Sequence, residues 1–89
     1  MYELNLLPTA IDDLRRLQKT VTQRIIAKLR WLAENFDSIR PQGLAGPLGG
    51  LNKLRVGDYR VIYEADRDKK SITVHLIGHR REIYRQMPE

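Results

Sequence analysis

The sequence from residue 51 to residue 65 reads LNKLRVGDYRVIYEA, and it predicts two short strands on either side of a tight turn. The strands are expected at Leu51–Val56 and Tyr59–Ala65, and the turn at Gly57-Asp58. A third strand-like segment, Ser71–Ile77, follows after a polar turn. Three consecutive short strands predict an antiparallel meander.

The first half of the chain predicts one more strand and two helices. Tyr2–Leu7 alternates imperfectly between apolar and polar residues, as a short strand does, and ends at Pro8. Thr9 is a candidate cap of the first helix, and Thr20 with Gln23 has the capping-box pattern that begins a second one. The apolar positions expected on the two helices are Ile11, Leu14, Leu17, Val21, Ile25, Leu29, Leu32, Ala33 and Phe36.

The order of these segments predicts an α+β fold. Helices and strands are grouped as β-α-α-β-β-β, so we expect a helical hairpin packed on one face of a mainly antiparallel, twisted sheet, with the other face free. Ser38–Gly50 is rich in proline and glycine and is expected to be a long surface loop. With 89 residues and 10.4 kDa, the whole chain, residues 1–89, is expected to be one domain.

Composition excludes several classes of protein. The chain has no cysteine, which excludes disulfides, thiolate metal sites and a cysteine nucleophile and is typical of a reducing compartment. It has no apolar run long enough for a membrane span and no secretion signal at its start. We therefore expect a soluble, unprocessed, cytoplasmic protein.

The net charge of +5 comes from sixteen Lys and Arg against eleven Asp and Glu, and eleven of the sixteen cations are arginine. The planar guanidinium suits phosphate, so this bias favours nucleic acid or an acidic partner. The alternative is an ordinary small basic protein, because net charge informs about association and not about fold.

Three cations are expected close together on the meander. Successive side chains of a strand point to opposite faces, so Lys53 and Arg55 share a face, away from Leu54. The tight turn should bring Arg60 of the next strand near them. The alternative is a charged sheet face that is merely solvated.

The tail is the second basic stretch. Gly78 is followed by HRREIYR at His79–Arg85, which places three arginines, a histidine and a tyrosine within seven residues. Cations beside an aromatic ring suit a phosphodiester and an unstacked base. The alternative is a basic C-terminal strand whose Ile83 and Tyr84 pack on the sheet.

Other catalytic classes lack their residues. His75 and His79 are four apart on a predicted strand, and so expected on the same side, but no carboxylate ligands accompany them, which makes a zinc site improbable. His75 is expected to be a packed histidine. The stretch Gly43–Gly50 lacks the Lys-Ser/Thr ending of a phosphate loop, and no serine lies in a nucleophile elbow.

The segment Lys53–Tyr63, followed by Gly78–Tyr84, resembles the RelE/ParE superfamily of toxins from type II toxin–antitoxin pairs. The resemblance covers nearly the whole chain and includes the loop Leu44-Ala45-Gly46. It implies a RelE-like single-domain fold and, for the RelE branch, a ribosome-dependent endoribonuclease that cuts mRNA in the A site. In that reaction the ribose 2′-hydroxyl attacks the adjacent phosphate, with neither metal nor cofactor. The implied partners are a cognate antitoxin, the ribosome and mRNA, in the cytoplasm of a prokaryote.

The resemblance also implies roles for individual residues. Lys53 and Arg55 match the basic strand positions, Arg60 the phosphate-contacting arginine, Arg80 the tail arginine near the leaving group, and Tyr84 the aromatic that stacks on or orients the target nucleotide. Arg81 and Arg85 would add to RNA binding.

Two features depart from the family pattern. Some relatives carry a second lysine where this chain has Leu51, so a lysine base is less secure. His79 and Glu82 are candidates for sharing proton transfer with Tyr84. Two other functions stay open: a ParE-like inhibitor of DNA gyrase without nuclease activity, and a non-catalytic RNA-binding module.

Overall fold

The computed structural model describes residues 1–44 and 49–86. The elements in chain order are β1 Glu3–Leu6, α1 Pro8–Arg15, α2 Lys19–Asn35, the 3₁₀ turn η1 Phe36–Ser38, β2 Gln42–Gly43, β3 Asn52–Val56, β4 Tyr59–Asp66, β5 Ser71–His79 and α3 Arg80–Gln86.

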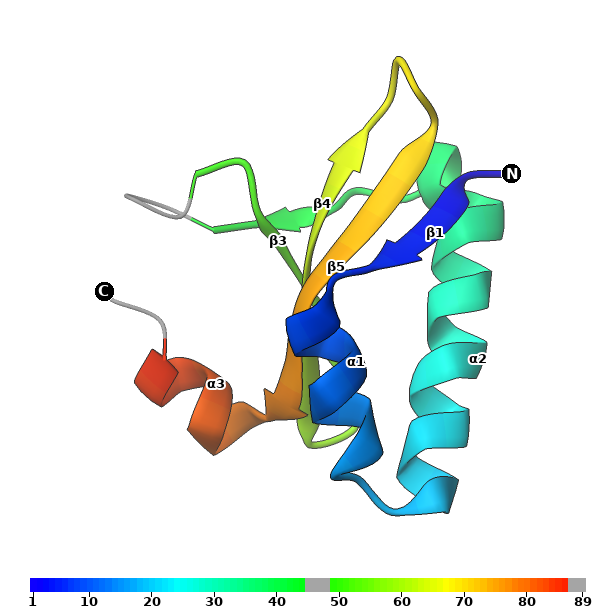
Figure 1. Cartoon of the computed structure of the whole chain (residues 1–89). Coiled ribbons are helices and arrows are strands. Elements are labelled where there is room, and N and C mark those ends of the chain that lie inside the picture. The colour runs from blue at the N-terminus through cyan, green and yellow to red at the C-terminus, as the bar shows by residue number, and fades with distance from the viewer. Residues whose placement is uncertain (45–48, 87–89) are drawn as a thin grey trace.

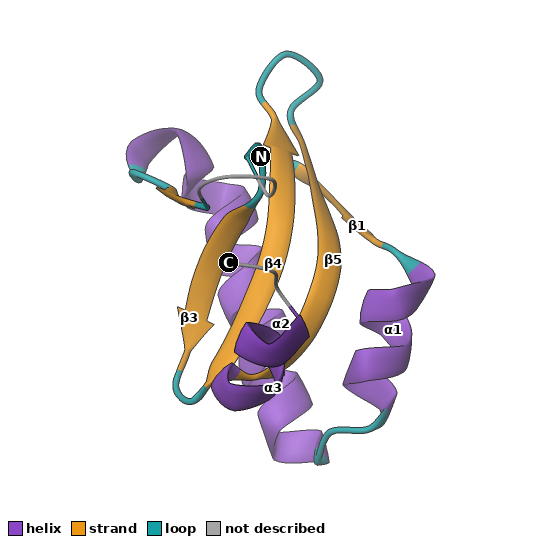
Figure 2. Ribbon diagram, turned by 90° about the vertical axis from the view of Figure 1, so that its left-hand side faces the viewer, coloured by secondary structure: helices purple, strands orange, loops and turns teal. Residues whose placement is uncertain are grey.

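The strands form one sheet in the order β1-β5-β4-β3-β2. β1 pairs with β5 in parallel, and the other neighbours are antiparallel. α1 and α2 lie on one side of the sheet and α3 lies on the other, in front of β4 and β5 (Figures 1 and 2). The predicted α+β fold with a helical hairpin on one face is therefore confirmed. The expectation of a free opposite face is wrong at the end covered by α3, and the alternative of a C-terminal strand is wrong because the tail is helical.

Both predicted helix caps are wrong. α1 begins at Pro8, whose fixed φ suits the first helical position, so the proline that ends β1 also starts the helix. The Thr9 hydroxyl instead donates to the carbonyl of His75 at 2.7 Å and ties α1 to β5. α2 begins at Lys19, so Thr20 already lies inside its first turn, and no side chain caps this helix.

The hydrophobic core lies between α2 and the sheet. Ile25, Leu29 and Leu32 of α2 are buried against Val61 and other apolar residues of the sheet. Phe36, at the end of the helix, packs its ring 5.0 Å from Tyr2 and 6.2 Å from Tyr63, measured between ring centroids. Ile11, expected on the buried stripe of α1, is exposed.

The predicted loop Ser38–Gly50 contains regular structure. Gln42 and Gly43 pair with Lys53 and Asn52, so β2 adds a short fifth strand beyond the predicted four. Ala45 and Gly46, which belong to the loop used in the family resemblance, lie outside the described residues.

A β-bulge alters β5. Tyr63 pairs with Val74 and Ile62 with Leu76, so His75 is an extra residue on β5. Its Nε2 lies 3.1 Å from Oε1 of Glu64, on the face opposite the core. The expectation that His75 and His79 share a side is wrong, because the bulge breaks the alternation between them. None of the helices in the described part of the chain is long and apolar enough to cross a membrane.

Candidate functional site

Strand register places three of the predicted cations together. Arg55 pairs directly with Arg60, and Lys53 pairs with Ile62, the next residue on the same face. Directly paired residues of antiparallel strands point to the same face. Lys53, Arg55 and Arg60 therefore share the sheet face opposite α1 and α2, which we call the open face.

The hairpin turn brings Arg60 inward. Gly57 has φ +59°, a conformation that glycine adopts at low cost in a two-residue hairpin turn. Nη1 of Arg60 donates to the carbonyls of Gly57 and Tyr59 at 2.9 and 2.8 Å, and only 4% of the residue is exposed. Its Nε is also buried and has no acceptor among the described atoms. Arg60 is thus the one buried charged residue in the described part of the chain.

α3 brings the tyrosine of the tail to the same face. Ile83 is 1% exposed and packs closely on Gly78, where a Cβ would lie 3.3 Å from Ile83 Cδ1. The Arg80 amide donates to the carbonyl of Asp58 at 2.8 Å, which joins the start of α3 to the β3–β4 turn. One position after Ile83, the ring of Tyr84 has its centroid 5.6 Å from Nζ of Lys53.

Neighbouring cations act on the phenol of Tyr84. Hydrogen bonding from the Arg60 guanidinium, and then the positive charges of Lys53 and Arg60, lower the pKa of Tyr84 below its ordinary value, against an opposing effect of desolvation. Tyr84 is 47% exposed, so a ligand in solution can reach it. Lys53, Arg55, Arg60 and Tyr84 form what we call the open-face cluster.

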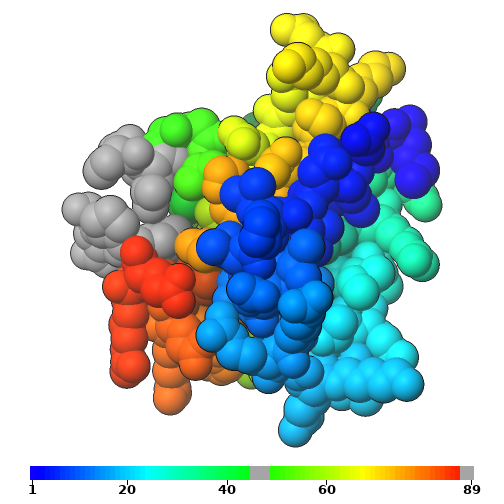
Figure 3. Space-filling view, viewed as in Figure 1, coloured from blue at the N-terminus to red at the C-terminus, as the bar shows by residue number. Residues whose placement is uncertain are grey.

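The structure does not bring every candidate to this cluster. His79 pairs with Tyr59, so it points to the other face, where the two ring centroids are 5.6 Å apart. Its Nδ1 accepts from the amide of Arg81 at 3.2 Å. Glu82 lines a cleft between α1 and α3, beside Asp13 and Arg16, and these helices lie next to each other in the space-filling view (Figure 3).

The remaining tail arginines, Arg80, Arg81 and Arg85, are exposed on α3. Gln42 was not predicted, yet its pairing with Lys53 places it on the open face. A two-residue strand inside a glycine- and proline-rich segment has no period that would have revealed it. Within residues 1–44 and 49–86, no three His, Asp or Glu side chains gather closely enough to hold a metal ion.

Comparison with known proteins identifies the family. The model of the ParE toxin of type II toxin–antitoxin systems, parDE, matches residues 4–84. The chain belongs to the ParE toxin family. The predicted membership of the RelE/ParE superfamily is thereby confirmed, and the protein is a toxin of a type II toxin–antitoxin system. No curated protein sequence matches this toxin.

Solved structures share the fold of this toxin. The RelBE2 toxin–antitoxin complex from Mycobacterium tuberculosis matches with a TM-score of 0.80 at 22% identity, over 88% of this chain and 96% of that one. The isolated RelE toxin of E. coli matches with a TM-score of 0.74 at 21% identity, over 98% and 100%. A double arginine-to-alanine mutant of E. coli RelE in the free state has a TM-score of 0.72 and 28% identity, over 96% and 92%.

Proposed function

We propose that this toxin is a metal-independent endoribonuclease that cuts mRNA in the ribosomal A site and so stops translation. The observation that carries the proposal is the open-face cluster, in which an exposed tyrosine with a lowered pKa lies beside Lys53 on a face that also holds Arg55 and Arg60. Cations and an aromatic side chain are the groups that a phosphodiester and an unstacked base require.

The cations would stabilise the charge that develops on phosphate. When the ribose 2′-hydroxyl attacks phosphorus, its proton leaves and a second negative charge grows on the phosphoryl oxygens. The P–O5′ bond then breaks, which yields a 2′,3′-cyclic phosphate and a 5′-hydroxyl. Lys53 and Arg55, which are the more accessible cations of the cluster, would hold the phosphoryl oxygens, and fixed cations are the largest stabilising influence in such a step.

Proton transfer would involve Tyr84. A phenol whose pKa is lowered by neighbouring cations is ionised in a larger fraction of molecules near neutral pH and can accept the 2′-hydroxyl proton. Arg60 is buried, so its task in the proposal is to hold the β3–β4 turn and to favour the phenolate. Arg80, at the start of α3, remains the proposed cation near the leaving oxygen, which must gain a proton.

Inhibition of DNA gyrase without nuclease activity is the second candidate. The observation that favours it is the family model, which is that of ParE toxins. The open-face cluster favours cleavage instead, since inhibition by binding alone does not need a tyrosine whose phenolate is stabilised by cations.

One experiment distinguishes the two functions. The toxin is induced in cells, 5′ ends of messages are mapped by primer extension, and supercoiling by gyrase is assayed in parallel. New cuts within translated codons, absent from a Lys53→Gln, Tyr84→Phe double variant, are expected. Loss of supercoiling without cuts would establish gyrase inhibition. If neither cuts nor loss of supercoiling is seen, the remaining function is that of a non-catalytic RNA-binding module.

The proposal includes a cognate antitoxin, encoded beside the toxin, that neutralises it. Several structures that share the fold are toxin–antitoxin complexes, from E. coli, Pyrococcus horikoshii and Methanococcus jannaschii among others. The basic open face and the seam between helices and sheet are the surfaces that an acidic antitoxin would cover.

A further inference from the structure

A polar strip crosses the open face beside the open-face cluster. Glu64 pairs with Thr73, and Thr73 pairs with Asn5, so these three side chains share one face of the sheet. Tyr63, next to Glu64, belongs to the core, which places Glu64 and its partners on the opposite, open face. His75 joins them through its contact with Glu64. We call Asn5, Glu64, Thr73 and His75 the polar strip.

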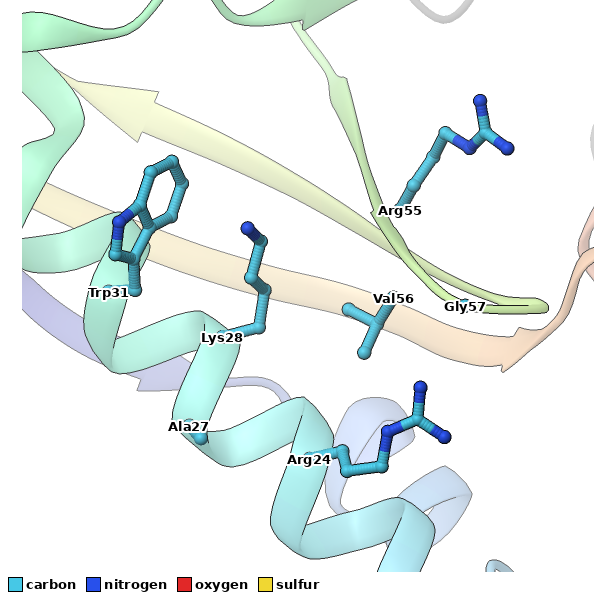
Figure 4. Close-up of a pocket in the computed structure, with 7 residues that line it drawn as sticks. All are labelled: Arg24, Ala27, Lys28, Trp31, Arg55, Val56 and Gly57. Carbon is cyan, nitrogen blue, oxygen red and sulfur yellow. The ribbon is translucent and has the colours of Figure 1, made fainter.

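The polar strip lies close to the residues that the cleavage proposal uses. Arg55 projects from β3 away from α2, whereas Val56 points toward the helix (Figure 4), so the open face is the one that carries Arg55 and Lys53. Lys53 pairs with Ile62, and His75 lies beyond Ile62 in the bulge of β5. Neighbouring strands are about 4.8 Å apart, so Lys53 and His75 are separated by about 10 Å across the sheet. One nucleotide spans such a separation between its phosphate and the edge of its base.

The fold fixes the position of His75. The bulge adds a residue to β5, and bulges of this kind re-aim side chains beside active sites. The carbonyl of His75 accepts from the Thr9 hydroxyl at 2.7 Å, so α1 holds the backbone of the bulge. The ring is held as well, because its Nε2 lies 3.1 Å from Oε1 of Glu64. Backbone and side chain are thus both positioned in advance, as recognition of a ligand requires.

The polar strip offers hydrogen-bond acceptors and no lysine or arginine. A carboxylate only accepts hydrogen bonds, so the His75 ring in its neutral form carries its proton on Nε2 and donates it to Glu64. Nδ1 of His75 and Oε2 of Glu64 then remain as acceptors. The side chains of Glu64 and His75 are 54% and 30% exposed, so a ligand can reach them. Because a carboxylate repels phosphate, RNA would meet the strip through a base.

An acceptor of this kind distinguishes bases by their amino groups. Cytosine presents an exocyclic amine at the position where uracil presents a carbonyl oxygen. A carboxylate accepts a hydrogen bond from the amine and repels the oxygen. Since the two bases are alike in size and both present a face for stacking, the amine is the group that Glu64 can select.

We propose that the polar strip reads a base next to the phosphate held by the open-face cluster. Glu64 accepts from the exocyclic amino group of that base, and His75 positions the carboxylate. This role rests on the proposed cleavage of mRNA, to which it adds a preference for adenine, cytosine or guanine over uracil at one position.

The test measures binding of short 2′-O-methyl oligonucleotides, which lack the attacking hydroxyl and are therefore bound without being cut. The wild-type toxin is expected to bind an oligocytidine about tenfold more tightly than an oligouridine in fluorescence anisotropy titrations, as one hydrogen bond to a charged acceptor provides. Glu64→Gln should reduce this ratio to about one, because an amide can also donate to the uracil oxygen. His75→Phe should lower the ratio too, because Glu64 then loses the ring nitrogen that orients it.

Glu34→Gln is the matched control. Glu34 is an exposed carboxylate on α2, on the other side of the sheet, and its replacement removes the same charge. Both variants should bind RNA somewhat more tightly through their higher net charge, but Glu34→Gln should keep the wild-type ratio between the two oligonucleotides.

Three results would overturn the inference and leave the nuclease proposal standing. They are equal affinity of the wild type for the two oligonucleotides, an unchanged ratio in Glu64→Gln, and an equal loss of the ratio in Glu64→Gln and Glu34→Gln. Binding of neither oligonucleotide would instead leave the toxin without affinity for RNA, and would overturn the nuclease proposal together with the inference.

Discussion

Arg60 is constrained in a way that its neighbours are not. Lys53 and Arg55 project from the same face, but Arg60 is buried and its Nη1 is committed to two carbonyls of the hairpin. A guanidinium in this position donates to the turn and lowers the pKa of Tyr84. Mutation of Arg60 is therefore expected to alter both stability and the proposed chemistry, whereas mutation of the exposed Arg55 should alter the proposed chemistry alone.

Replacing Arg60 by Met is expected to lower the free energy of unfolding by about 1–3 kcal/mol, because it leaves two part-buried carbonyl oxygens of the hairpin without their donor. Arg55→Met, which changes an exposed cation on the paired position, should change it by no more than about 0.5 kcal/mol. Urea denaturation followed by circular dichroism measures both. Equal midpoints for the two variants would show that the Arg60 hydrogen bonds are not stabilising.

The pH dependence of cleavage tests Tyr84. If its phenolate accepts the 2′-hydroxyl proton, activity rises with pH along a limb below the ordinary tyrosine pKa of about 10. Lys53→Gln removes a charge that lowers the pKa of Tyr84, so this limb should move to higher pH. Tyr84→Phe should abolish it. The profile is measured on ribosomes loaded with a defined message.

His79→Ala is the control for that profile. His79 lies beside Tyr59 on the face of the sheet opposite the open-face cluster. The variant should therefore keep the shape of the wild-type pH–activity curve. A wild-type limb that disappears in His79→Ala would instead assign the proton transfer to the histidine.

At the scale of elements, α3 determines where Tyr84 lies. The helix has seven residues, and Ile83 is its one buried side chain within the described range. Ile83→Ala is expected to weaken the packing of α3 on the sheet by about 2–5 kcal/mol of free energy, because it removes most of a buried side chain. Amide exchange in α3 should accelerate while β4 stays protected, and cleavage should fall with it. The control is Arg85→Ala, an exposed change on the same helix; equal exchange in both variants would contradict the anchoring role of Ile83.

The strands of this fold could be predicted because their pattern is local. Alternation and the Gly57-Asp58 turn placed β3 and β4 within about one residue at each end, and hence Lys53, Arg55 and Arg60 on one face. The helix α3 could not be predicted, because two apolar residues in seven give no periodic stripe and its position depends on the contact of Ile83 with Gly78. The burial of Arg60 likewise depends on carbonyls that only the folded turn presents.

At the scale of the whole molecule, the positive charge is unevenly placed. Lys53 and Arg55 give the open face a basic region on β3. Other cations, such as Lys19 and Arg30, lie exposed on α2, which is on the other side of the sheet from the open face. This distribution separates two explanations of RNA binding, attraction by net charge and contact at a defined site.

Two double variants with the same loss of charge distinguish these explanations. Lys53→Gln, Arg55→Gln removes phosphate contacts of the proposed site, so the slope of log affinity against log salt for a uridine oligonucleotide should become less steep by about 1.4, at about 0.7 per contact on a single strand. Lys19→Gln, Arg30→Gln removes two charges outside the site and should leave the slope unchanged. Titrations from low to physiological salt measure both slopes. An equal change in the two variants would mean that net charge holds the RNA. That result would contradict the proposal that the open-face cluster binds the phosphate that is cut.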